Sequence, residues 1–142
     1  MTGFLLDTNV PCELTRPRSD SNVEKWLGDA NDDLLYLSVV SLGEIYKGLA
    51  ILPLSRRREQ LQDWLEETLR PWFGGRILPI SETIARRWGT LAGECQIQGR
   101  SLKLADGLIA ATALEHNLSV VTRNVRDFEG LGLQVINPWT AV

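Results

Sequence analysis

The sequence contains few of the side chains that carry out most enzyme chemistry. It has one histidine, His116, and two cysteines, Cys12 and Cys95. The cysteines are far apart and show no C-x-x-C or Cys/His spacing, so we expect neither a disulfide framework nor a zinc site. His116 follows a helical pattern, and a polar side chain near a helix C-terminus is common. Any catalysis should therefore proceed without histidine acid–base chemistry.

Long apolar runs and targeting signals are also lacking. No run approaches the roughly 20 residues that span a bilayer. The start Met1-Thr2-Gly3 has no basic region and no small-residue cleavage site. We therefore expect a cytoplasmic protein without a membrane partner. The length of 142 residues and the ordinary composition predict one domain over residues 1–142.

The chain has no excess of positive charge, which a nucleic-acid partner usually requires. Its formal net charge is −3. However, 12 of the 15 basic residues are arginine, which suits bidentate contacts to phosphate. If three carboxylates belong to a metal pocket, the rest of the chain is neutral and its surface can hold basic patches. The run Arg56-Arg57-Arg58 is either a solvated helix start or one such phosphate contact.

Five short β-favouring apolar runs alternate with helical segments along the chain. The runs cover residues 4–6, 34–37, 77–80, 119–122 and 134–136. Helical patterns cover residues 22–30, 40–52, 56–72, 82–98 and 105–117. In the third helix, Trp64 and Trp72 share one stripe, which forms either core or a subunit interface. The alternation predicts an α/β protein, a three-layer α/β/α sandwich with a central parallel sheet.

Three carboxylates are candidates for a common site. Asp7 ends the first strand, at the sheet edge where ligands bind in open parallel sheets, although it could instead cap the next helix. Glu44 follows Ser41 at the spacing of a capping box, which is the competing structural role. Asp106 lies in a first helical turn and shares a face with small apolar residues. It needs a partner there, and its helix offers no basic one.

If these three side chains converge, they form a cation site. Carboxylates about 4 Å apart repel by on the order of 4 kcal/mol per pair at an effective dielectric of 20. Protonation or a bound cation relieves that repulsion. Oxygen ligands without histidine or thiolate select Mg²⁺ or Mn²⁺, which can activate water to attack a phosphodiester. The acids therefore indicate a metal-dependent phosphodiesterase.

The order and spacing of several motifs resemble the PIN-domain ribonucleases, and within them the FitB/VapC toxins. The similar segments are Leu5-Leu6-Asp7-Thr8-Asn9, Ser41-Leu42-Gly43-Glu44 with Gly48, Gly75-Arg76-Ile77-Leu78-Pro79, Ala105 to Ala113, Val121-Thr122-Arg123-Asn124 and Asn137-Pro138-Trp139. The resemblance extends nearly from end to end. It implies a PIN-like fold, Mg²⁺- or Mn²⁺-dependent cleavage of RNA, and a homodimer. It also implies neutralisation by a cognate antitoxin, often a ribbon-helix-helix protein, through which the pair binds DNA.

Carried over by position, the resemblance makes Asp7, Glu44 and Asp106 the catalytic and metal-binding acids. Thr8 and Thr122 match polar residues that line such a site. The family often has a fourth acid two residues after that second threonine, where this chain has Asn124. Asp127 is the nearest carboxylate that can replace it, and its competing role is a surface pair with a neighbouring arginine.

Two other functions fit parts of the pattern. A non-catalytic PIN-like module that binds RNA or protein would explain the missing fourth acid. A receiver-like phosphoryl-transfer domain also has aspartates at strand ends, but no lysine follows the fourth strand as that chemistry requires: Thr122 is followed by Arg123. The ribonuclease hypothesis accounts for more of the motifs than either alternative.

Overall fold

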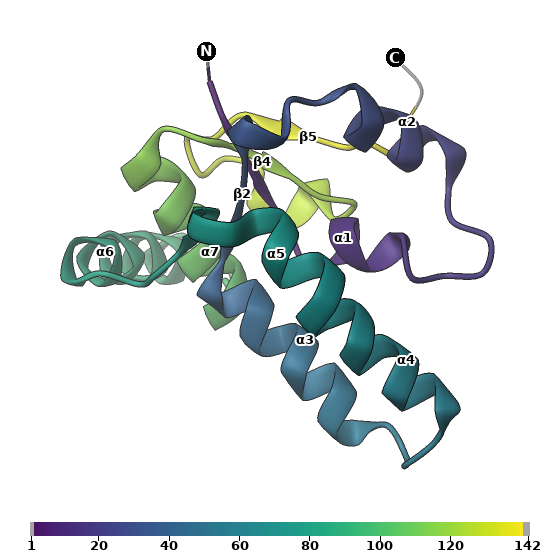
Figure 1. Cartoon of the computed structure of the whole chain (residues 1–142). Helices are drawn as coiled ribbons and strands as arrows, with labels where there is room; N and C mark the ends of the chain where they lie inside the picture. The colour runs from purple at the N-terminus through teal and green to yellow at the C-terminus, as the bar shows by residue number, and fades with distance from the viewer. Residues whose placement is uncertain (1, 141–142) are drawn as a thin grey trace.

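The computed structural model describes residues 2–140, which form a five-stranded parallel sheet between helices. The strand order is β3-β2-β1-β4-β5, so that β1 is central. Figure 1 labels β2, β4 and β5 of this sheet. The strands are Phe4–Leu6 (β1), Leu35–Ser38 (β2), Ile77–Leu78 (β3), Ser119–Val121 (β4) and Val135–Ile136 (β5). All five predicted strands are present, with bounds that differ by at most two residues, and the predicted parallel sheet is confirmed.

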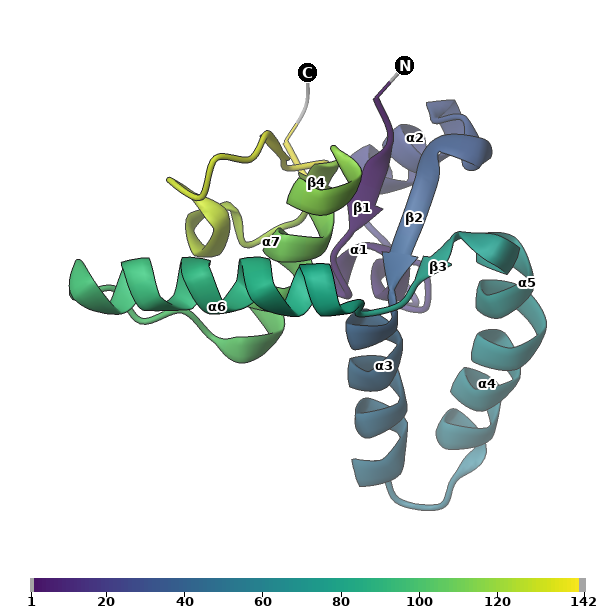
Figure 2. The ribbon, with the colours of Figure 1, turned by 90° about the vertical axis from the view of Figure 1, so that its left-hand side faces the viewer.

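The helices cover both faces of this sheet. They are Asn9–Glu13 (α1), Ser21–Asp29 (α2), Val39–Ile51 (α3), Arg56–Trp64 (α4), Arg70–Phe73 (α5), Glu82–Ile97 (α6) and Leu104–His116 (α7). Short 3₁₀ turns occupy Asp32–Leu34, Gly74–Arg76 and Val125–Phe128. Figure 2 shows α6 and α7 on one side of the strands and α3 to α5 on the other, where the α3–α4 hairpin extends beyond the sheet.

Adjacent residues of the central strands contribute to two different cores, because side chains of a strand alternate between its faces. Leu6 and Val121 pack with α1 to α3 and α5, whereas Leu5 and Val120 pack with α6 and α7. All four side chains are fully buried. The predicted three-layer α/β/α sandwich is therefore confirmed.

The helix predicted over residues 56–72 is not continuous. Between α4 and α5 the chain makes a π turn over Leu65–Leu69, in which the N–H of Arg70 donates to the carbonyl of Leu65. Pro71 follows directly; it has no N–H, and its ring crowds the carbonyl four residues earlier in a regular helix. A wider turn relieves that crowding. Sequence periodicity alone does not reveal such an interruption.

The tryptophan stripe on these helices contributes to the core. Leu65 and Leu69 are fully buried, and Trp64 and Trp72 are half-buried and pack against the same cluster. These contacts support the core interpretation of the stripe over a subunit interface. Between residues 2 and 140, no helix is both long and apolar enough to cross a membrane.

Candidate active site

The candidate site lies at the carboxyl ends of β1 and β4, where the strand order reverses direction. This switch point is the usual ligand position in open parallel sheets. Asp7 follows β1 and is only 6% exposed. Its carboxylate accepts a hydrogen bond of 2.7 Å from the Thr122 hydroxyl and one of 2.9 Å from the Thr8 N–H. Asp7 therefore does not cap the next helix, whose N-cap residue is Thr8.

Burial is the main influence on the Asp7 carboxyl and raises its pKa. The hydrogen bonds from Thr122 and Thr8 act in the opposite direction, and the charges of Glu44 and Asp127 raise the pKa further. The two donors thus favour the ionised form of Asp7, whereas burial and the neighbouring acids disfavour it. A carboxyl group with a perturbed pKa in a pocket is a candidate functional group.

Glu44 belongs to this site and not to a capping box. The helix begins three residues earlier than the box requires, because Ser38 is the N-cap and its hydroxyl accepts from the Val40 N–H at 3.0 Å. Glu44 lies in the second turn, exposed, and accepts a hydrogen bond of 2.8 Å from the Thr8 hydroxyl. The predicted alternative of a Ser41–Glu44 box is therefore wrong. The Ser41 hydroxyl is buried and has no hydrogen-bond partner among residues 2–140.

Asp106 lies in the first turn of α7, at the edge of its buried face. Burial, followed by the charges of Asp127 and Asp7, raises its pKa to about 6. Lys103, the residue before the helix, lowers the pKa. The expectation that Asp106 has no basic neighbour holds for the helix itself, but Lys103 supplies a partial counter-charge from the N-cap position.

Asp127 is folded back toward the other acids. The 3₁₀ turn Val125–Phe128 begins after Asn124, whose carbonyl accepts from the Asp127 N–H at 3.1 Å. The guanidinium of Arg100 donates to the main-chain carbonyls of Arg126, Asp127 and Glu129, and so fastens this turn. Between residues 2 and 140 Asp127 forms no ion pair with a neighbouring arginine, so the surface-pair alternative is not supported.

These side chains enclose a pocket of about 330 Å³. Its walls are formed by Asp7, Thr8, Asn9, Cys12, Glu44, Lys103, Ala105, Asp106, Asn124 and Asp127. Thr122 lies behind the wall, where its oxygen also accepts from the Asn124 N–H at 3.0 Å. The predicted site residues are thus brought together from β1, α3, α7 and the segment after β4.

Asn9 has a positioning role that sequence reasoning did not assign. Its side-chain N–H group lies 3.4 Å from the Asp7 carboxylate, and its carbonyl accepts from the Arg123 N–H at 3.3 Å. The side chain therefore joins the segment after β1 to the segment after β4. The available signal was the position of Asn9, two residues after Asp7 within the first motif.

The pocket offers carboxylate, hydroxyl and amide oxygens as possible metal ligands. A hard divalent cation prefers such oxygen ligands. Among residues 2–140, no three acidic, histidine or cysteine side chains lie close enough to hold one ion in the conformations described. Glu44 is exposed and Asp106 and Asp127 are partly exposed, and all three line the same pocket as the buried Asp7. The chemistry of these oxygen ligands fits a hard divalent cation.

Comparisons with known proteins give consistent matches. A family model described as PIN domain matches residues 4–132. VapC ribonuclease Y4jK of Sinorhizobium fredii is 38% identical over 136 residues, 96% of this chain and 97% of that protein. Toxin FitB of Neisseria gonorrhoeae is 37% identical over 136 residues, 96% of this chain and 98% of FitB.

Solved structures show the same likeness. The crystal structure of FitAcB from Neisseria gonorrhoeae superposes with a TM-score of 0.91 at 36% identity, covering 97% of this chain and 99% of that one. FitAB bound to an IR36 DNA fragment superposes with a TM-score of 0.92 at 34% identity, covering 98% and 97%. The five-stranded sheet and its flanking helices are thus shared with these proteins.

Proposed function

We infer the chemistry of the acidic pocket from the premise that this chain belongs to the PIN-domain family, and within it to the VapC/FitB-type ribonuclease toxins of toxin–antitoxin systems. It is an endoribonuclease. We propose that Asp7, Glu44 and Asp106 are its catalytic residues and hold Mg²⁺ or Mn²⁺. One observation carries this proposal: the three acids reach one pocket at the switch point of the sheet, and the pKa of two of them is raised.

The chain's own residues prepare the pocket for a cation. Thr122 and the Thr8 N–H keep Asp7 fixed, and the Thr8 hydroxyl orients Glu44. When bound, the cation would lower the pKa of a water molecule and neutralise the attacked phosphate. Asp106 would complete the ligand set, and relief of the repulsion among the acids would favour binding.

Asn124 and Asp127 bear on how many ions the pocket takes. The Asn124 amide can ligate a cation or hold its water, but it lacks the charge of a carboxylate. Asp127 adds a fourth carboxylate to the wall of the acidic pocket. It does so from the turn Val125–Phe128, three residues after the position at which the family often has its fourth acid. We therefore expect one cation to bind well through Asp7, Glu44 and Asp106, and a second to depend on Asp127.

The partners that we propose follow from the relatives. FitAB was solved on a DNA fragment, and VapBC from Salmonella typhimurium was also solved bound to DNA. We propose that this chain forms a homodimer in the cytoplasm, that a cognate antitoxin of the ribbon-helix-helix type neutralises it, and that the pair binds DNA through that antitoxin. RNA is the substrate of the free toxin.

Cleavage by purified, antitoxin-free protein tests the proposed site. A fluorescent single-stranded RNA is incubated with Mg²⁺, Mn²⁺ or excess chelator, using the wild type, Asp7→Asn, Asp106→Asn and the control Asp63→Asn. Asp63 is exposed on α4, outside the pocket. We expect cation-dependent cleavage by the wild type and the control, and a loss of at least about 100-fold in the other two. Undiminished cleavage by both site variants, or by the wild type in chelator, would refute the metal mechanism.

A non-catalytic binding module is the alternative that Asn124 favours. It predicts tight RNA or protein binding without cleavage under any cation condition, and an unchanged affinity for RNA in Asp7→Asn. The same protein preparations distinguish the two, because binding and cleavage are measured separately.

A further inference from the structure

A second hollow adjoins the acidic pocket, between α1, α3 and α4. It has a volume of about 270 Å³ and shares Thr8, Cys12 and Glu44 with the acidic pocket. Beyond these residues its walls are mostly apolar, and Leu61 and Trp64 form the side given by α4. A chain that crosses the acidic pocket can therefore continue directly into this groove.

Two arginines are anchored at the rim of the groove. Arg57 donates to the main-chain carbonyl of Thr15 at 3.3 Å, and Arg58 donates to that of Leu52 at 3.1 Å. Thr15 and Leu52 both line the groove. Neither arginine is in an ion pair with any residue between 2 and 140. A guanidinium has five N–H donors, so each arginine retains donors for an anion.

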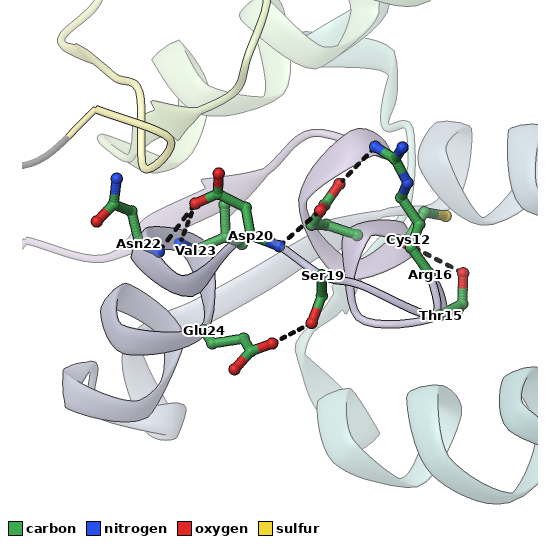
Figure 3. Close-up of polar contacts among 9 residues, drawn as sticks. Cys12, Thr15, Arg16, Ser19, Asp20, Asn22, Val23 and Glu24 are labelled. Atoms are coloured by element: carbon green, nitrogen blue, oxygen red, sulfur yellow. Dashed lines mark hydrogen bonds and ion pairs between the residues drawn. The ribbon is translucent and has the colours of Figure 1, made fainter.

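The segment that presents the Thr15 carbonyl is itself held in place. The Thr15 hydroxyl donates to the Cys12 carbonyl at 2.7 Å (Figure 3). The buried Glu13 carboxylate accepts from the Asp20 N–H at 2.8 Å and forms an ion pair with Arg16. Asp20 in turn caps α2. These contacts fix the link between α1 and α2, and with it the acceptor that positions Arg57.

The groove wall beside the shared residues is mostly apolar, because Ile45, Leu49 and Leu61 line it. Cys12 is half-buried and lines both the groove and the acidic pocket. Trp64 is half-buried, which leaves part of its ring available to a ligand.

We propose that this groove binds one unpaired nucleobase of the RNA substrate against Trp64, while Arg57 and Arg58 bind the flanking phosphates. The inference rests on the proposed ribonuclease function of the adjoining pocket. Single-stranded RNA is recognised by aromatic side chains that stack on bases and by positive groups that follow the backbone. An apolar peptide would fill the groove equally well, but it would leave both guanidiniums without a counter-charge, and for this reason we favour RNA.

RNA with one missing base tests the position of Trp64. All proteins carry Asp106→Asn, so that a short fluorescent RNA stays intact in Mn²⁺, and abasic sites are placed at each position in turn. We expect Trp64→Leu to weaken binding on the order of tenfold, and Trp64→Phe, which keeps a ring, to weaken it much less. When the abasic site is at one particular position of the RNA, the Asp106→Asn parent protein should bind that RNA as weakly as Trp64→Leu binds the intact RNA. Trp64→Leu should show no further loss of affinity for that abasic RNA. Because the abasic substitution leaves the protein unchanged, a folding defect in a variant cannot imitate this result.

Salt dependence tests the two arginines. Each phosphate contact to single-stranded nucleic acid contributes about −0.7 to the slope of log K against log salt. Arg57→Ala and Arg58→Ala should each reduce the slope by about that amount. Arg86→Ala is the matched control, because Arg86 is a 78% exposed arginine on α6 that does not line the groove. Its slope should equal that of the parent.

The outcomes separate this inference from the proposed function. If every abasic position weakens the parent protein and Trp64→Leu equally, no base occupies the groove and the inference is wrong, even when the wild type cleaves RNA. If the groove variants bind RNA normally but lose affinity for the purified antitoxin, the groove is an antitoxin surface and the inference is also wrong. If the base is detected in the groove but the wild type never cleaves RNA, only the proposed nuclease function fails.

Discussion

Replacing Asp106 by asparagine should stabilise the metal-free protein at neutral pH. The rise in the Asp106 pKa from 3.8 to about 6 means that the folded chain disfavours the ionised carboxylate. At about 1.4 kcal/mol per pKa unit the shift corresponds to about 3 kcal/mol. Because the side chain is partly exposed, solvent screening reduces this to about 1 kcal/mol. For a domain of this size the change raises Tm by about 3 °C.

The effect should depend on pH in a defined direction. A carboxyl group whose pKa is raised by folding favours the folded state when it is protonated, so that its penalty is absent below about pH 4, grows with pH, and is complete above about pH 6. The difference in Tm between Asp106→Asn and the wild type should therefore vanish near about pH 4 and reach its maximum at neutral pH. Thermal unfolding in chelator, followed by circular dichroism, measures it.

A divalent cation should reverse the order of stability, so that wild type becomes more stable than Asp106→Asn. Mn²⁺ that binds only the folded state stabilises the protein according to its concentration relative to Kd. Wild type should gain more than Asp106→Asn, because the variant has lost one of the proposed charged ligands. Asp63→Asn, the exposed control on α4, should follow wild type in both conditions. An Asp106→Asn protein that is less stable than wild type in chelator at neutral pH would refute the argument that repulsion and burial strain this carboxylate.

Four further outcomes follow from the pocket and from the helices α6 and α7. Asn124→Asp should lower the Mn²⁺ concentration needed for half-maximal RNA cleavage, and an unchanged midpoint would show that this position does not face the cation. Asp127→Asn should raise that midpoint but reduce cleavage less than Asp106→Asn does. Gly107→Ala should destabilise by about 1 to 3 kcal/mol in chemical denaturation, because a Cβ there would lie 2.7 Å from the Trp88 ring. Gly93→Ala on α6, which meets open space, should instead stabilise by up to about 1 kcal/mol.

Much of the fold could be predicted because its signals are local. Each strand is a short β-favouring run, and the alternation with helices dictates a parallel sheet with two covered faces. The position of Asp7 beside the switch point followed from the same pattern. The π turn could not be predicted, because it depends on how Pro71 is accommodated while Leu65 and Leu69 stay in the core.

The candidate site was harder to predict where side chains from distant segments meet. The choice between cap and ligand for Glu44 depended on whether α3 begins at Ser38 or Ser41, and both serines fit the local pattern. The counter-charge from Lys103 and the anchoring of the Asp127 turn by Arg100 depend on tertiary contacts. The apolar groove forms only when α1, α3 and α4 assemble, so the sequence of no single segment predicts it.

The hydrogen bond between Thr122 and Asp7 joins residues 115 positions apart. At a synthesis rate of about 5 to 20 residues per second, a ribosome needs roughly 6 to 23 seconds to travel from one to the other. During that interval β1 has no β4 beside it, and Asp106 is absent for most of the time. A nascent chain thus carries only half of the acidic pocket.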